Sequence, residues 1–257
     1  MGTAGSEGLR PERAQMKRQQ LIAWVATGVA ALIVLAVAGL LVARNQAPAA
    51  PPPAKPSDAD LNAPKALRDA AAAVGFKPEP IPGVGNIEDD PASDATTPTT
   101  TGLLKVGAAA PVFTATTPLG EKVSLAALKG KAVLLEFFAT SCPHCQAEAP
   151  HLEKMYRSLD KSRYAVVGVN ADGENAASVY AYHRYFGLSF PTVIDHGAQV
   201  GSWHSPAAPG PITSSYHIAR YPTFYVLRPD GTVQWVSDGE QPTAKLQQEL
   251  QQAAGSR

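Results

Sequence analysis

The only two cysteines of this 257-residue chain are Cys142 and Cys145, and they come directly after an apolar run at residues 132–139. A run of this length that ends in a turn predicts a buried strand followed by a helix. Both sulfur atoms then lie at the helix N-terminus, where unpaired backbone N–H groups favour a thiolate. This placement favours a redox-active dithiol, with Cys142 as the nucleophile and Cys145, one turn inside the helix, as the resolving thiol.

The residues by themselves leave two other interpretations of the cysteine pair open. A structural zinc site usually needs four ligands, and the chain has no second cysteine pair to complete one. A static disulfide is the other possibility. His144 lies between the cysteines, where an imidazole or imidazolium would help to stabilise a thiolate at Cys142. We therefore expect thiol exchange with no cofactor other than the redox-active disulfide itself.

Two further residues are candidates for supporting the dithiol. Glu136 is the charged residue of the apolar run, and burial would raise its pKa and suit it to shuttle the proton of Cys145. The alternative is a Glu136 that lies on an exposed strand edge or pairs with Lys131. Pro222 opens a predicted strand at 223–227, where it needs an explanation because proline donates no hydrogen bond to a sheet. A cis bond would explain it, although most X-Pro bonds are trans.

Nucleic-acid binding and metal binding are both disfavoured. The 22 Lys and Arg residues balance 22 Asp and Glu residues, so no net field attracts nucleic acid. The other histidines have no metal-binding spacing, and we interpret them as ordinary surface or core residues. They are His151, His183, His196, His204 and His217.

Residues 21–43 carry no charge and, at about 1.5 Å per residue, are long enough to cross a hydrocarbon core of about 30 Å. They predict a transmembrane helix. Residues 1–20 contain more basic side chains than the segment that follows the helix, so the positive-inside rule places the N-terminus in the cytoplasm. A cleaved signal peptide is the alternative, but its apolar segment is usually shorter. Everything after the helix is then exported.

The exported part has two regions of different composition. Residues 44–102 are rich in Pro, Ala and Thr and predict an extended linker, with a short helix near 62–76. From residue 103 to 257, strands alternate with helices, which is typical of an α/β domain with parallel strands. We expect a proline-containing loop at 197–215. The expected strands are 112–116, 122–123, 132–139, 164–170, 190–194, 223–227 and 233–236, and the expected helices are 124–129, one from the dithiol to about 159, 174–186 and 241–253.

Residues 106–240 resemble the membrane-anchored, thioredoxin-like TlpA/ResA group of bacterial thiol-disulfide oxidoreductases. The matching segments are VGAAAPVF, VSLAALKGK, LEFFATSCPHC and YHIARYPTFYV, in that order. The resemblance implies a thioredoxin fold, a central mixed sheet flanked by helices, behind the transmembrane helix and linker. It also implies that Cys142 is the nucleophile, that Cys145 is the resolving thiol, that Glu136 takes the place of the buried thioredoxin acid, and that Pro222 is a cis-proline facing the dithiol.

The same resemblance implies a cellular setting. It implies a single-pass protein of the bacterial inner membrane with a periplasmic catalytic domain. Its partners would be client proteins with cysteines or disulfides, as in cytochrome c maturation, and a DsbD/CcdA-like electron donor in the membrane. Ser141 departs from the family's usual Trp, and Pro143-His144 is the dipeptide of the oxidant DsbA. The membrane-anchored architecture favours a reductase, and a DsbA-like oxidase or isomerase is the alternative.

Two further functions are possible on the same fold. A copper-binding metallochaperone module would use the two thiolates and a distant histidine, such as His204 or His217, although such modules usually place three residues between the cysteines. A peroxiredoxin needs Thr or Ser three residues before its reactive cysteine, and Ala139 stands there.

Overall fold

The computed structural model of this chain describes residues 63–79, 102–196, 198–202 and 205–255. The predicted cytoplasmic segment at 1–20, the transmembrane helix at 21–43 and most of the predicted linker lie outside these residues. Across the described ranges, no helix combines the length and the apolar character that a membrane crossing requires.

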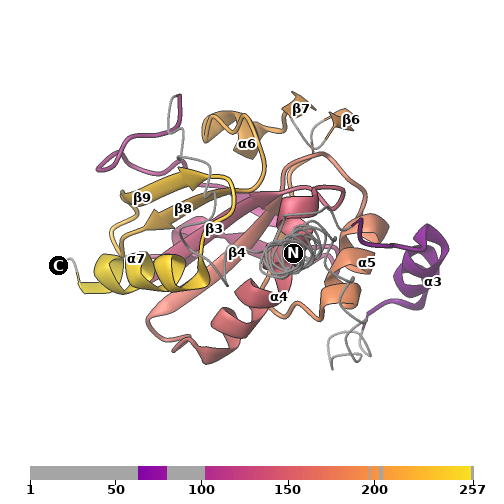
Figure 1. Cartoon of the computed structure of the whole chain (residues 1–257), viewed down its shortest axis with the longest axis horizontal. Coiled ribbons are helices and arrows are strands. Elements are labelled where there is room, and N and C mark those ends of the chain that lie inside the picture. Colours follow the sequence, from indigo (N-terminus) through magenta and orange to yellow (C-terminus); the bar gives the residue numbers. More distant parts are fainter. Residues whose placement is uncertain (1–62, 80–101, 197, 203–204, 256–257) are drawn as a thin grey trace, which may run out of the picture. The chain divides into compact units, whose positions relative to one another are not determined.

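A five-stranded mixed sheet forms the centre of the domain, with the strand order β5-β4-β3-β8-β9 (Figure 1). The first three of these strands run parallel to one another, whereas β8 and β9 are antiparallel to their neighbours. Every residue of the central strand β3 is buried, which explains why its sequence is a nearly continuous apolar run. The strands are β3 (Ala132–Phe138), β4 (Tyr164–Asn170), β5 (Thr192–Ile194), β8 (Thr223–Leu227) and β9 (Val233–Asp238).

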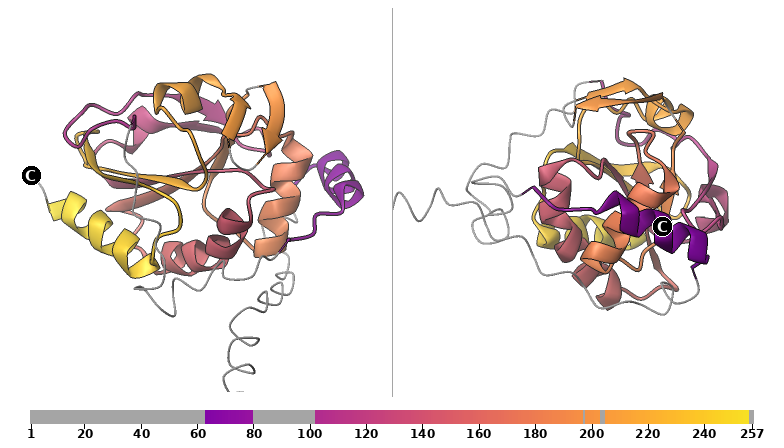
Figure 2. Two further views of the ribbon diagram at one scale, coloured as in Figure 1. Left: turned by 45° about the horizontal axis from the view of Figure 1, so that its top comes forward. Right: turned by 90° about the vertical axis from the view of Figure 1, so that its right-hand side faces the viewer.

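Secondary-structure elements cover both sides of this sheet. The long helices α4 (Pro143–Ser158) and α7 (Thr243–Gly255) lie along one side, and the short elements near α6 lie along the other (Figure 2). Alternate side chains of β3 reach the two layers, because Phe137 contacts Tyr216 and Phe138 contacts Tyr182. Five shorter elements complete this part of the domain: β1 (Thr114–Thr116), β2 (Lys122–Ser124), η2 (Leu125–Leu128), α5 (Ala176–Phe186) and α6 (Pro211–Ser215).

The predicted central mixed sheet and its helices are confirmed, and two strands have the predicted bounds, 164–170 and 223–227. The segment predicted as a helix at 124–129 is a single turn of 3-10 helix instead, and the Ser124 side chain makes no capping hydrogen bond. The remaining elements begin or end a few residues from their predicted positions, where hydrogen bonding rather than composition decides the bound.

The prediction that residues 197–215 form only a loop is wrong. This segment contains a two-stranded ribbon, β6 (Ala198–Ser202) paired with β7 (Ser205–Ala208), followed by α6. The prolines of this segment favoured the loop prediction. However, Pro206 lies in β7, which has only one partner strand in the ribbon, and sheets tolerate proline at such positions. Pro211 is the first residue of α6, where the helix does not need its N–H. The Asp195 carboxylate accepts the Thr213 N–H at 2.6 Å and fixes the start of α6.

The short helix predicted near 62–76 is α3 (Lys65–Val74), and it packs against α5 rather than standing apart from the domain. Phe76 follows α3 and contacts the aromatic rings of Tyr182, Tyr185 and Phe186, all of them on α5. This part of the predicted linker therefore belongs to the packed surface of the domain.

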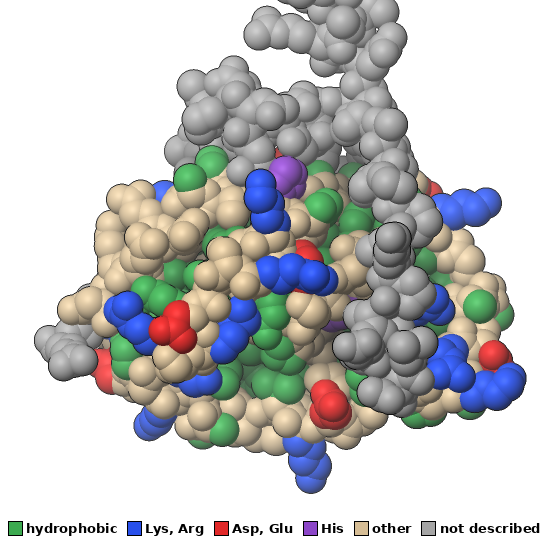
Figure 3. Space-filling model, turned by 90° about the horizontal axis from the view of Figure 1, so that it is seen from below, with side chains coloured by type: hydrophobic (Ala, Val, Ile, Leu, Met, Phe, Trp, Pro, Cys, Tyr) green, Lys and Arg blue, Asp and Glu red, His purple; other side chains and the backbone are tan. Residues whose placement is uncertain are grey.

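The face that carries α4 and α7 mixes charged side chains of both signs with apolar and neutral polar ones (Figure 3). This distribution agrees with the zero formal net charge of the chain. A mixed surface of this kind favours solubility and gives no single-sign field across this face.

Candidate active site

The dithiol lies at the predicted place, where β3 ends and α4 begins. Cys142 is the N-cap residue of α4, and its Sγ accepts a hydrogen bond from the Cys145 backbone N–H at 3.4 Å. Pro143 occupies the first turn, where its lack of an N–H is harmless. Both cysteines are free thiols and both are buried. The Cys142 sulfur therefore lies at the N-terminus of α4, and the Cys145 sulfur lies one turn inside the helix.

The surroundings affect the two thiols in opposite directions. The pKa of Cys142 is lowered, mainly by its hydrogen bonds from Cys145 and also by the charge of His144, against the opposing effect of burial. The pKa of Cys145 is raised well above its usual value, chiefly by burial and then by its interaction with Cys142. A thiolate at Cys142 and a protonated thiol at Cys145 are the forms that this site favours.

Glu136 lies beneath the dithiol on β3, between Gly168 of β4 and Phe224 of β8. It is only 3% exposed, and within the described part of the chain its Oε1 has no hydrogen-bond partner. The alternative of an exposed edge position is wrong, because β3 is the central strand. Lys131 does not pair with it either, since its Nζ donates to the Lys161 carbonyl oxygen. Burial, and secondarily the charge of Cys142, raises the pKa of Glu136 to about 8.

His144 is held by a carboxylate that the sequence did not single out. Its Nδ1 contacts Oε1 of Glu240, which follows β9 in the chain. This contact raises the pKa of His144 and outweighs the effect of partial burial, while the charge of Cys142 acts in the same direction as Glu240. Both carboxylate and thiolate thus shift His144 toward the imidazolium form.

The Tyr221-Pro222 peptide bond is cis, as the resemblance implied. The Pro222 carbonyl oxygen accepts the Gly239 N–H at 2.8 Å, which joins this turn to the end of β9. The Tyr221 hydroxyl donates to the Ala171 carbonyl oxygen, and burial raises its pKa, with smaller contributions from nearby groups that include both cysteines. The turn therefore lies within electrostatic range of the dithiol.

Sequence reasoning missed the second buried acid beside the dithiol. Glu148 is 3% exposed, its Oε1 accepts the Gln241 N–H at 2.5 Å, and in the described residues its Oε2 has no hydrogen-bond partner. Burial raises its pKa well above the usual value, and the charges of Glu136, Glu240 and Cys142 add to this effect. Its helical spacing of three residues from Cys145 was a usable signal, because positions three apart share a helix face.

Two neutral residues also tie α4 to its neighbours. Gln146 donates to the Thr140 carbonyl oxygen at 2.8 Å and accepts the Glu79 backbone N–H at 2.8 Å. The Tyr182 hydroxyl donates to the Cys145 carbonyl oxygen at 2.9 Å. The contacts with Glu79 and Tyr182 join segments that are distant in the chain, so nothing in the sequence spacing indicated them.

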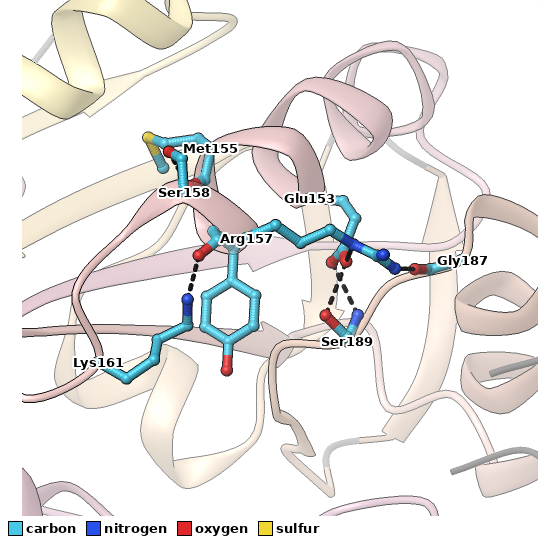
Figure 4. A network of polar contacts seen from close by, with 8 residues as sticks. Glu153, Met155, Arg157, Ser158, Lys161, Gly187 and Ser189 are labelled. Carbon is cyan, nitrogen blue, oxygen red and sulfur yellow. Dashed lines mark hydrogen bonds and ion pairs between the residues drawn. The ribbon is translucent and has the colours of Figure 1, made fainter. Parts of the chain in front are cut away.

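The far half of α4 is anchored by Glu153 (Figure 4). Its carboxylate accepts the backbone N–H and the hydroxyl of Ser189, each at 2.7 Å, and contacts Nε of Arg157. These contacts tie α4 to the segment between α5 and β5. The orientation of the helix that presents the dithiol is thereby fixed from its other end.

The remaining histidines in the described residues have ordinary surroundings. The ring of His183 contacts the Thr192 hydroxyl at 2.7 Å, and that of the exposed His217 contacts the Gly102 carbonyl oxygen at 2.9 Å. The described part of the chain brings no three His, Cys, Asp or Glu side chains into an arrangement that could hold a metal ion. His204 lies outside the described residues.

A mixed sheet, a helix that begins at a Cys-Pro-His-Cys sequence and a buried acid beneath it define the class of thioredoxin-like α/β proteins. The AhpC/TSA family model matches residues 106–236. The chain belongs to this family.

Known relatives agree with this class. The chain is 32% identical to the thioredoxin-like protein YneN of Bacillus subtilis over 148 residues, which are 57% of this chain and 79% of the relative. It is 30% identical to the thiol-disulfide oxidoreductase ResA of Bacillus cereus, across 58% of this chain and 78% of the relative. A crystal structure of a candidate thiol:disulfide interchange protein DsbE from Chlorobium tepidum has a TM-score of 0.50 at 24% identity and matches 59% of this chain and 99% of its own. That likeness shows the thioredoxin-like fold.

Proposed function

We propose that this chain is a thiol-disulfide oxidoreductase that reduces disulfides of client proteins through Cys142 and Cys145. The observation that carries the proposal is the start of α4, where Cys142 accepts an N–H bond and the buried Cys145 lies near the Glu136 carboxyl group, one oxygen of which has no hydrogen-bond partner among the described residues. The name of the relative ResA, a thiol-disulfide oxidoreductase, supports the same activity.

The reaction moves two electrons from the dithiol to the client. The Cys142 thiolate attacks one sulfur of a client disulfide, which forms a mixed disulfide and releases the other client sulfur as a thiolate. Cys145 then loses its proton and attacks the Cys142 sulfur, which releases the second client thiolate and leaves a Cys142–Cys145 disulfide. Because Cys142 is buried in this structure, the client reaches it only after neighbouring groups move aside.

The proton of Cys145 goes to a nearby carboxylate, and Glu136 is the residue that we assign to this step. The charge of Cys142 is one of the two causes that raise the pKa of Glu136. When Cys142 enters the mixed disulfide it loses that charge, so the pKa of Glu136 falls and the side chain is more readily ionised. Glu136 then accepts the proton at the step that requires a base.

The same proposal places the catalytic domain outside the cytoplasm. The apolar residues 21–43 would anchor the protein in the bacterial inner membrane with its N-terminus in the cytoplasm, and residues 80–101 would belong to a periplasmic tether. A DsbD/CcdA-like membrane protein would supply electrons, and apocytochrome c cysteines are candidate clients. A reporter fused after residue 257 and active only in the periplasm tests this orientation, and a cytoplasmic signal would contradict it.

A thiol oxidase of the DsbA type is the second candidate, and one observation favours it. The contact with Glu240 raises the pKa of His144 and so favours a positive charge beside Cys142, and a stabilised thiolate makes the reduced form more stable and the disulfide more oxidising. The reduction potential separates the two functions. A potential near that of thioredoxin, about −270 mV, supports the reductase, and one near that of DsbA, about −120 mV, supports the oxidase.

The direct test uses the full chain in detergent, equilibrated with glutathione and assayed for insulin reduction. The wild type should catalyse reduction and Cys142→Ala should not. Retention of activity by Cys142→Ala would show that the assigned mechanism is wrong.

Two assays separate this function from the remaining alternatives. Tight binding of Cu(I) that needs a histidine would support a metallochaperone, whereas binding that survives the loss of every histidine argues against such a site. Rapid reaction of Cys142 with hydrogen peroxide would support a peroxidase. We expect slow reaction, because the apolar Ala139 offers no side-chain hydroxyl near the thiolate.

A further inference from the structure

The turn between β9 and α7 touches the active-site helix at two points. The Glu240 carboxylate contacts Nδ1 of His144, and the next residue, Gln241, donates its backbone N–H to Oε1 of Glu148 at 2.5 Å. Both contacts fall on the first two turns of α4, the part that carries the dithiol. A segment about a hundred residues away in the sequence thus holds the side chain between the two cysteines.

The surroundings of Glu240 make its charge effective. Its side chain is 11% exposed, whereas that of His144 is 37% exposed. A carboxylate that is sheltered from water is screened weakly, so it favours the charged form of a neighbouring imidazole more than a surface carboxylate would. A charged imidazole at His144 in turn stabilises the thiolate of Cys142.

We propose that Glu240 is a positioning residue that keeps His144 protonated beside Cys142 and so sets how strongly the dithiol favours its reduced form. The inference rests on the proposed thiol exchange and adds a residue that determines its redox balance. Glu240 acts through His144, because it is His144 that lies between the cysteines while Glu240 approaches it from another element.

The direction in which loss of Glu240 changes the stability of the Cys142 thiolate distinguishes an action through His144 from a direct one. The Cys142 thiolate faces His144 from the start of α4 and also favours its protonation. Glu148 lies further along α4, Glu136 lies on β3, and the charge of Glu240 raises the pKa of Glu148. If Glu240 acted mainly by repelling Cys142 directly, its removal would stabilise the thiolate. If it acts through His144, its removal must destabilise the thiolate.

The test compares the full-length wild type with Glu240→Gln. We expect the titration midpoint of the His144 ring, followed by NMR, to fall, and the rate of Cys142 alkylation at neutral pH to fall severalfold. The equilibrium constant for reduction of the disulfide by glutathione should fall about tenfold, equivalent to about 30 mV for this two-electron couple. An unchanged His144 midpoint, or faster alkylation, would overturn the inference.

Two controls separate this effect from a general one. In a His144→Ala background, Glu240→Gln should leave the glutathione equilibrium unchanged, and a persistent shift would mean that Glu240 acts by another route. Asp69→Asn removes the same charge from an exposed pair with Lys65 on α3 and should change none of the three measurements. Exchange that is absent in the wild type overturns the proposed function itself, whereas normal exchange with an unshifted Glu240→Gln equilibrium overturns only the role of Glu240.

Discussion

Glu148 and Glu153 lie on the same helix and are both buried, but their carboxylates have different surroundings. Glu153 accepts two hydrogen bonds from Ser189 and contacts Arg157, whereas Glu148 has one donor and one oxygen without a partner in the described residues. Buried polar groups in proteins are normally satisfied, and exceptions gather at functional sites. The first half of α4 therefore carries a buried carboxyl group with a raised pKa, as we expect of a reactive site, whereas the second half is fixed by a carboxylate that contacts three donors.

Cys142→Ala should cause the largest loss of activity, and it tests whether the first half of α4 is the reactive half. We expect insulin reduction to fall to the background rate, at least about a thousandfold, because the remaining cysteine, Cys145, lies one turn inside α4 with a raised pKa and is a poor nucleophile toward a client disulfide. Thermal unfolding should change little, since Ala is also small and apolar. Cys145→Ala is the companion variant, and it should accumulate mixed disulfides that Cys142→Ala cannot form.

Glu136→Gln should lower activity and raise stability, with both effects dependent on pH. The pKa of Glu136 is raised from 4.5 to about 8, so its contribution to stability is present below pH 4.5 and is lost as the pH rises to about 8. Gln carries no charge to bury, so at pH 9 its unfolding free energy should exceed that of the wild type by a few kcal/mol, on the basis of about 1.4 kcal/mol for each tenfold change in a proton-binding equilibrium. Denaturant unfolding at pH 5 and pH 9 measures the difference.

The activity of Glu136→Gln completes this test. Loss of the base should slow resolution of the mixed disulfide by about ten- to a hundredfold. The variant should therefore be more stable than the wild type at pH 9 but slower at exchange. A variant that is less stable at pH 9 would contradict the description of Glu136 as a buried acid without a compensating partner.

Glu153→Gln and Glu148→Gln form a matched pair on α4. At Glu153 the amide replaces an acceptor that receives three donors, so we expect a loss of about 1–3 kcal/mol in unfolding free energy. At Glu148 the carboxyl group already has a raised pKa, so the neutral amide should be tolerated or stabilising above pH 7. The potential should be unchanged in Glu153→Gln. Equal destabilisation of both variants would remove the distinction between the two halves of the helix.

Phe76→Ala tests whether the packing of the α3 segment is separate from the chemistry. The ring contacts three aromatic residues on α5 and is partly buried, so its removal should cost about 1–3 kcal/mol of stability. Exchange rates measured well below the unfolding temperature should stay within about twofold of the wild type. A larger loss of activity would connect this segment to the dithiol, for which the Glu79 contact with Gln146 would be the route.

Much of the fold could be predicted from local sequence, because the evidence for each element lies within it. The apolar run of β3, the dithiol at the start of α4 and the alternation that follows were sufficient for an α/β domain with parallel strands, and the resemblance to the TlpA/ResA group supplied the mixed sheet. The ribbon of β6 and β7 escaped prediction because its prolines are tolerated only where a strand has one neighbour. Strand neighbours are a property of the sheet and cannot be read from a single segment.

The sequence by itself identified Cys142 and Cys145 as the candidate reactive pair, because two cysteines after a buried strand leave little choice of nucleophile. It also identified Glu136 as an unusual charge in an apolar run. Only the tertiary structure decided that one Glu136 oxygen has no hydrogen-bond partner in the described part of the chain, that Glu148 lies near it and that Glu240 contacts His144. The physical reason is that burial and ion pairing depend on which distant segments meet, whereas secondary structure and thiol spacing are local.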